Sequence, residues 1–224
     1  MAYPQKRPLM RITTRPPHLE TPFAVFNDGV ITPNDAFFVR YHLANIPLSV
    51  DVSTYRLKVR GKVDTELSLS LSDLQRMGSP VEIVAVNQCS GNSRGYSMPR
   101  VFGAQLGNGS MGNARWVGVP LRTVLRKAGV MAGSVQITFN GLDSPVLPGT
   151  SDFIKALDID VAMHPDILLA WSMNGADIPM LNGYFAPQGT LVYYQFGKQR
   201  SHPRWTSHTH QGNRLRWRRG HQNS

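Results

Sequence analysis

Residues 81–95 read VEIVAVNQCSGNSRG, an apolar run that leads into a short polar loop. The run over 81–86 predicts a buried β-strand, because a short apolar stretch bounded by turn residues is typical of one. Cys89 follows at once and is the only cysteine in the 224 residues. A thiolate at the end of a strand, with Arg94 nearby, is suited to bind a soft metal. A lone cysteine also packs well as a small apolar side chain, so both interpretations are open at this point.

Outward from this stretch, the chain up to residue 184 reads as short elements separated by glycine, proline and polar residues. Further strands are predicted at 35–42, 135–139 and 167–173, with a hairpin over 55–69. Helices are predicted at 70–78, which starts with a capping-box pattern, and at 120–129, which has proline first and glycine last. Asn174-Gly175 is typical of a type I′ turn. Because strands outnumber helices and do not alternate with them regularly, we expect a mixed, mostly β, α+β fold with short helices.

The formal net charge of +10 is concentrated at the carboxyl-terminal end of the chain. Residues 185–224 contain no Asp or Glu, and their seven basic residues are Lys198, Arg200, Arg204, Arg214, Arg216, Arg218 and Arg219. The rest of the chain is therefore only mildly basic. This composition favours a solvated tail. Nucleic-acid binding by the tail is an alternative, as is a divalent-metal site at His202, His208 and His210.

Composition also indicates the domain organisation. No stretch approaches the roughly 18 consecutive apolar residues of a membrane span. Residues 1–8 are polar and interrupted by proline where a signal peptide would be apolar. We therefore expect no membrane span and no export signal in the chain as written. The predicted division is an extended arm over 1–18, a folded domain over 19–184 and a basic, histidine-rich tail over 185–224.

Five motifs in register carry a family resemblance. They read FFVRYH at 37–42, NQCSGN at 87–92, GNARWVGVPL at 112–121, GLD at 141–143 and SMNG at 172–175. From Arg11 to Tyr184, the chain resembles the molybdopterin-binding domain of the sulfite oxidase family. Within that family, the likeness is strongest to the bacterial sulfite:cytochrome c oxidoreductases.

The resemblance implies a molybdenum–molybdopterin cofactor, with Cys89 as the protein ligand to the metal. It implies that Asp143 and Asn182 contact the pterin, although turn formation is an alternative role for both. The segment that would touch the cofactor comprises Phe38, Val39, Arg40, Tyr41 and His42.

The resemblance also implies the catalytic residues, which are Arg40, His42 and Arg94. Arg40 and His42 are two residues apart, so on an extended segment both side chains lie on the same face. Two guanidinium groups near one site would attract a small dianion such as sulfite.

The implied reaction is oxidation of sulfite to sulfate by oxygen-atom transfer. The sequence has no Cys-x-x-Cys-His haem motif, so the expected electron acceptor is a separate cytochrome c. Reduction of a sulfoxide is an alternative on the same fold, which two arginines disfavour because that substrate is neutral. A further alternative is an inactive, truncated fragment of such an enzyme.

The resemblance stops after Tyr184, where relatives continue with residues for the pterin phosphate and then with an immunoglobulin-like dimerisation domain. We therefore expect an incomplete cofactor site and no dimerisation domain. The acid-free composition of 185–224 leads to the hypothesis that a shifted reading frame produced this tail. The resemblance implies a periplasmic location, and the missing signal peptide leaves a cytoplasmic one open.

Overall fold

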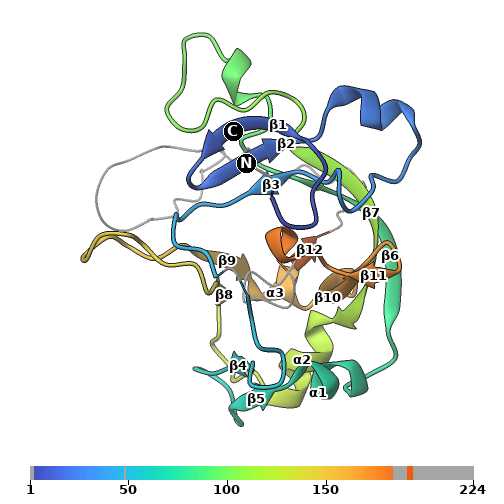
Figure 1. The fold of residues 1–224 in the computed structure, drawn as a ribbon. Coiled ribbons are helices and arrows are strands. Elements are labelled where there is room, and N and C mark those ends of the chain that lie inside the picture. Colours follow the sequence, from blue (N-terminus) through green and yellow to red (C-terminus); the bar gives the residue numbers. More distant parts are fainter. Residues whose placement is uncertain (1–2, 48, 184–190, 194–224) are drawn as a thin grey trace, which may run out of the picture.

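A five-stranded antiparallel sheet forms the centre of the protein (Figure 1). The computed structural model describes residues 3–47, 49–183 and 191–193. The strand order is β11-β10-β7-β6, and β12 also pairs with β10. These strands are β6 Val81–Gln88, β7 Met111–Pro120, β10 Ile167–Met173, β11 Ala176–Asp177 and β12 Leu191–Tyr193. The predicted mixed, mostly β fold is confirmed.

Smaller sheets surround this centre. Strands β1 Met10–Thr14, β2 Pro17–Glu20 and β3 Val39–Arg40 form a three-stranded sheet at the upper end in Figure 1. Two hairpins complete the strands, one from β4 Leu57–Val59 and β5 Leu67–Leu69, the other from β8 Gln136–Asn140 and β9 Ile154–Asp158.

The helices are short, as the sequence predicts. The α-helices are α1 Leu71–Arg76, α2 Leu121–Ala128 and α3 Ile159–Ala162, and the 3-10 turns are η1 Phe23–Asn27, η2 Arg94–Tyr96 and η3 Met180–Asn182. Since a membrane span needs about 20 residues, none of the helices in the described ranges has the length and apolar character to cross a bilayer.

Local sequence signals account for the ends of α1 and α2. The capping box of α1 is present, because the Ser70 hydroxyl accepts from the Asp73 N–H and the Asp73 carboxylate accepts from the Ser70 N–H. Helix α2 follows Pro120 and ends at Gly129, whose φ of 71° is left-handed. Asn174 and Gly175 both have positive φ, as a type I′ turn requires, and they join β10 to β11.

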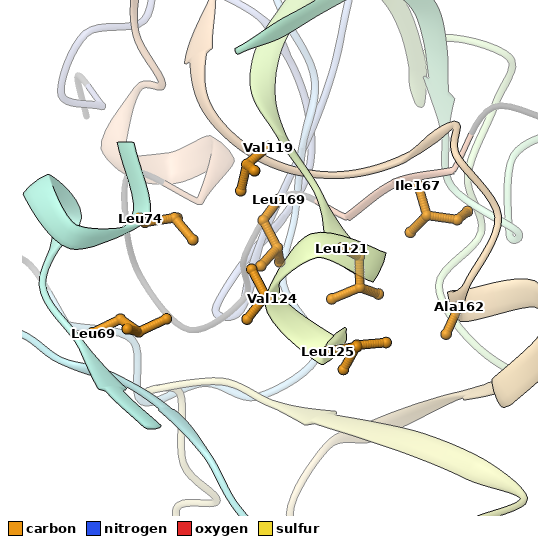
Figure 2. Packing of buried hydrophobic residues seen from close by; sticks show 9 residues of the cluster. All are labelled: Leu69, Leu74, Val119, Leu121, Val124, Leu125, Ala162, Ile167 and Leu169. Atoms are coloured by element: carbon orange, nitrogen blue, oxygen red, sulfur yellow. The ribbon is translucent and has the colours of Figure 1, made fainter. Parts of the chain in front are cut away.

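The largest hydrophobic core lies between α2 and the central sheet (Figure 2). The apolar face of α2 packs against β7 and β10, and α1, β5 and α3 close the sides. The buried members are Leu69, Leu74, Val119, Leu121, Val124, Leu125, Ala162, Ile167 and Leu169. Burial of each large side chain stabilises the fold by about 1.5–3 kcal/mol, so this cluster anchors the sheet that carries the site.

The predicted burial of the strand at 81–86 is wrong. In β6 only Ala85 is buried, at 1% exposure, whereas Val84 is 43% and Val86 51% exposed. Among the described strands β6 pairs with β7 alone, at the end of the sheet. Successive side chains of a strand point to opposite faces of the sheet, and Val84 and Val86 lie on the face opposite to that of the buried Ala85.

Three expected segments also differ from the structure. Residues 10–14 and 17–18 of the expected amino-terminal arm are paired strands, because β2 pairs with both β1 and β3. The strand expected at 35–42 is limited to Val39–Arg40. Residues 191–193, from the predicted tail, pair with β10. The remaining predictions for 185–224, including the histidine site, lie outside the described residues.

Candidate functional site

Cys89 follows β6 and opens the loop that leads to β7. Its N–H donates to the Ser110 carbonyl at 3.0 Å, and its carbonyl accepts from the Asn92 N–H at 2.9 Å. The Gly91 N–H donates to its Sγ at 3.3 Å. The half-buried cysteine also packs against a core cluster that includes Phe37 and Phe38, so its sulfur is held in place at the base of the loop.

Arg94 lies on the same loop, in η2, and its guanidinium group lies close to Gly91, two residues after Cys89. A methyl group at Gly91 would lie 3.0 Å from the Arg94 Cζ, and one at Gly103 would lie 2.6 Å from its Nη1. Both positions are glycine in a loop whose backbone approaches this cation closely. Arg94 therefore lies on the same loop as Cys89, close to Gly91, and its role at the site stays a prediction.

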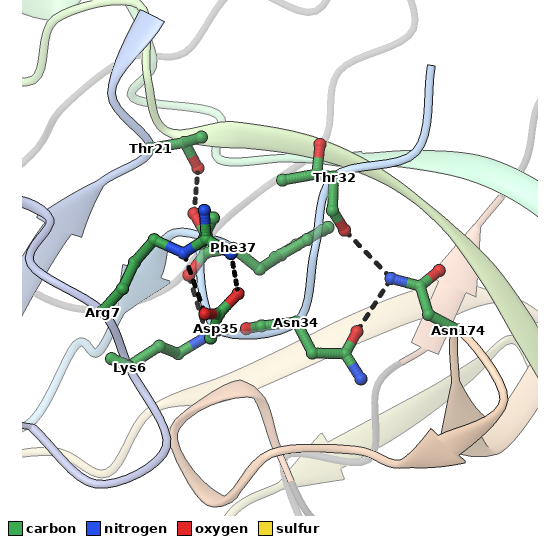
Figure 3. A network of polar contacts seen from close by, with 9 residues as sticks. Lys6, Arg7, Thr21, Thr32, Asn34, Asp35, Phe37 and Asn174 are labelled. Atoms are coloured by element: carbon green, nitrogen blue, oxygen red, sulfur yellow. Dashed lines mark hydrogen bonds and ion pairs between the residues drawn. The ribbon is translucent and has the colours of Figure 1, made fainter. Parts of the chain in front are cut away.

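The backbone before residue 38 is fixed by a polar network (Figure 3). Arg7 and Asp35 form an ion pair at 2.7 Å. The Thr21 hydroxyl donates to the Ala36 carbonyl at 2.8 Å, and the Asn174 amide donates to the Asn34 side chain at 2.8 Å. These contacts come from segments far apart in the sequence, so the position of residues 38–42 depends on the whole fold.

Within residues 38–42, three side chains are buried and two are available at the site. Phe38, Val39 and Tyr41 are buried, whereas Arg40 is half-buried and His42 is exposed. Arg40 donates through Nη1 to the Tyr41 carbonyl, and its Nε has no partner in the described part of the chain. Partial burial lowers the pKa of His42, and the positive charge of Arg40 contributes to this lowering.

Asp143 is the most unusual group in the site. Its side chain is 3% exposed, and neither carboxylate oxygen has a hydrogen-bond partner among the described residues. Burial raises the pKa of Tyr41 to about 12, and the negative charge of Asp143 contributes to the rise. The adjacent Ser144 N–H donates to the Asn45 carbonyl at 2.9 Å, which ties this loop to the chain just after His42. A buried carboxylate without a partner is costly.

Two residues that the sequence did not indicate lie near His42, with Phe153 on its ring and Lys155 over Phe153. The ring of Phe153 stacks on the imidazole, with centroids 4.0 Å apart, and Lys155 Nζ lies 4.6 Å from the centroid of Phe153. Partial burial lowers the pKa of His42, and Arg40 and Lys155 lower it further, while Asp143 opposes them. His42 is therefore mainly neutral at pH 7.

Asn182 acts on the backbone of the 38–42 segment. Its Nδ2 donates to the Phe38 carbonyl at 2.8 Å, and its Oδ1 accepts from Lys6 Nζ at 2.5 Å. Lys6, also not indicated by the sequence, donates in addition to the carbonyls of Asn34 and Phe37. Burial lowers the pKa of Lys6 to about 7, partly opposed by Asp35. The predicted contact of Asn182 with a cofactor stays a prediction.

The site thus consists of two groups. Cys89 and Arg94 form one, and Arg40, His42 and Asp143 form the other; Phe38 belongs to the core cluster against which Cys89 packs and precedes the second group directly. Over the ranges that the structure describes, no three His, Cys, Asp or Glu side chains are arranged to hold a metal ion.

The residues present fit a molybdopterin cofactor. A pterin ring carries N–H donors, which the unpartnered Asp143 carboxylate can accept. A soft thiolate donor from Cys89 fits a molybdenum centre. The fit therefore rests on the buried acceptor and on the chemistry of the sulfur donor.

Known proteins resemble this chain in sequence and in fold. A family model described as "Oxidoreductase molybdopterin binding domain" matches residues 42–187. Sulfite oxidase of Gallus gallus is 36% identical over 185 residues, which cover 79% of this chain and 39% of the relative. A nitrate reductase of Oryza sativa subsp. japonica is 30% identical over 193 residues, 82% of this chain and 21% of the relative. The crystal structure of the sulfane dehydrogenase SoxCD from Paracoccus pantotrophus has a TM-score of 0.59 at 29% identity and covers 70% of this chain and 38% of that chain.

The fold and the site define a molybdopterin-binding oxidoreductase domain. The chain belongs to the sulfite oxidase family. It spans 39% of the length of the Gallus gallus relative and 21% of the Oryza sativa relative.

Proposed function

We propose that this chain binds molybdenum through Cys89 and the pterin through Asp143 and residues 38–42, and that it oxidises sulfite to sulfate. The observation that carries the proposal is the buried Asp143 carboxylate, which lacks a protein partner in the described residues and lies near His42. Relatives named sulfite oxidase and sulfane dehydrogenase support a sulfur compound as the substrate.

A molybdenum cofactor, when bound, supplies two-electron redox chemistry and oxygen-atom transfer. Cys89 holds the metal, with its sulfur oriented by the Gly91 N–H. Asp143 accepts hydrogen bonds from the pterin and sets its orientation. The proposed electron acceptor is a cytochrome c, because the chain contains no haem-binding motif of its own.

Arg40 and Arg94 attract and orient the sulfite dianion. Sulfite carries two negative charges and three acceptor oxygens, which guanidinium groups bind through charge-assisted hydrogen bonds. Neutral His42 adds no further cation, so sulfate, also a dianion, is not held too tightly to leave. Partial exclusion of water strengthens each of these electrostatic contacts.

The test is sulfite-dependent reduction of cytochrome c by the purified chain, with its molybdenum content measured in parallel. Arg40→Gln is expected to raise KM for sulfite about tenfold or more, because one charge-assisted hydrogen bond is lost. Arg60→Gln, which changes an exposed arginine at the end of β4, is the matched control and should leave KM unchanged. A molybdenum-loaded chain that does not reduce cytochrome c with sulfite would contradict the proposal.

A further inference from the structure

His18 and Arg40 form a cross-strand pair next to the candidate site. His18 lies in β2 and pairs directly with Arg40 in β3. Residues that lie opposite each other in an antiparallel ladder have their side chains on the same face of the sheet. The family match begins at residue 42, after both of them, and His18 belongs to the segment that the sequence predicted to be an extended arm.

The hydrogen bonds of His18 define which ring nitrogen carries the proton. Its Nε2 lies 2.9 Å from the Tyr41 carbonyl, which can only accept, so Nε2 donates. Burial lowers the pKa of His18, the Tyr41 carbonyl opposes this, and Arg40 contributes to lowering it, so the ring is neutral at pH 7. Nδ1 is consequently a bare acceptor, and in a side chain only 6% exposed it has no partner among the described residues.

Arg40 presents the complementary group. Its Nε–H is a buried donor with no acceptor in the described ranges, while its Nη1 donates to the Tyr41 carbonyl. That carbonyl has two lone pairs and accepts from both His18 and Arg40. One buried donor and one buried acceptor therefore lie unpaired on two side chains that neighbour each other across the sheet.

We propose that His18 is a positioning residue for Arg40: when an oxyanion binds, the Arg40 Nε–H donates to His18 Nδ1, and the Nη2 group is directed to the anion. A bond between these atoms satisfies both at once, which removes the cost of two buried unpaired polar groups. It also fixes a long side chain whose free rotation would weaken anion binding.

This inference rests on the proposed role of Arg40 in binding the oxyanion, and it does not require sulfite turnover. The probe is sulfate, whose affinity for the purified full chain is measured by titration calorimetry, with molybdenum content determined for every variant. His18→Gln keeps a donor for the Tyr41 carbonyl but has no acceptor at the Nδ1 position. It is expected to weaken sulfate binding about fivefold and to leave the molybdenum content unchanged, since one hydrogen bond of ordinary net strength is lost.

A double-mutant cycle shows whether His18 acts through Arg40. Arg40→Gln alone should weaken sulfate binding about tenfold, and adding His18→Gln to it should cause no further loss. His18→Asn, which retains an amide oxygen close to the Nδ1 position, should recover part of the affinity. Arg11→Gln, on an exposed residue of β1, is the control for general loss of positive charge.

Three results would overturn the inference. Equal losses from His18→Gln in the wild-type and Arg40→Gln backgrounds would show that His18 acts independently of Arg40. A fall in molybdenum content with unchanged sulfate affinity would mean that Nδ1 serves the cofactor. Nitrogen NMR of the wild-type chain could also show that the His18 proton is on Nδ1. In that case Nδ1 could not accept a hydrogen bond from Arg40. If the double-mutant cycle gives the expected sulfate affinities but the chain does not oxidise sulfite, only the proposed function is refuted.

Discussion

Replacing Asp143 with asparagine is expected to stabilise the cofactor-free protein and to weaken cofactor binding. The side chain is 3% exposed, and both of its oxygens lack a hydrogen-bond partner in the part of the chain that the structure describes. A buried polar group without a partner costs about 1–3 kcal/mol, and a charged one costs more. Asparagine has the same shape without the charge, so the free energy of unfolding should rise by about 1–2 kcal/mol.

The assay is urea unfolding of protein produced without the cofactor, together with metal analysis of protein produced with it. Asp143→Asn should hold much less molybdenum than the wild type, because the pterin loses a charged acceptor. Asp177→Asn, an exposed position in β11, is the control and should change the free energy of unfolding by less than about 0.5 kcal/mol. A destabilised Asp143→Asn protein would refute the reasoning, since it would show that the carboxylate is already stabilised by the protein.

Three further predictions concern charge and packing around the site. Lys155→Met should raise the pKa of His42, because a nearby positive charge is removed; nitrogen NMR of the imidazole measures it, and an unchanged or lower pKa would contradict the stacked arrangement. The pKa of Lys6 is lowered to about 7, so between about pH 7 and 10 the unfolded state binds more protons and the free energy of unfolding should rise with pH. Lys6→Met should abolish that rise in urea titrations; if the rise persists, its source is another group. Gly118→Ala should destabilise the protein by about 3 kcal/mol or more, because the added methyl would lie 2.3 Å from the backbone of β10. Gly78→Ala, where the methyl makes ordinary contacts at 3.6 Å, is the matched control, and equal unfolding midpoints would contradict the packing.

Local signals explain which elements could be predicted from the sequence. Three features depend only on residues close to one another in the sequence. They are helix α2 with Gly129 at its end, the capping box at Ser70 and the Asn174-Gly175 turn. The exposure of Val84 depends instead on what packs against its face of the sheet. An apolar run predicts a strand but does not indicate how many of its faces are covered.

The residues of the candidate site also fall into those that a local motif indicates and those that only long-range folding brings there. The motifs predicted Cys89 and Asp143, because each lies in a short run with a distinctive order of residues. His18 and Lys155 have no such signal, since His18 reaches Arg40 through strand pairing and Lys155, in β9, reaches the ring that stacks on His42. Lys6 likewise reaches its acceptors only through long-range folding.

X-ray absorption at the molybdenum edge, compared between the purified wild-type chain and Cys89→Ser, tests the central claim most directly. The account predicts that the wild-type chain contains molybdenum, and that the variant has one sulfur ligand fewer on any metal it retains. Molybdenum with the same sulfur coordination in both proteins, or a wild-type chain without molybdenum, would contradict the assignment of Cys89 as the metal ligand.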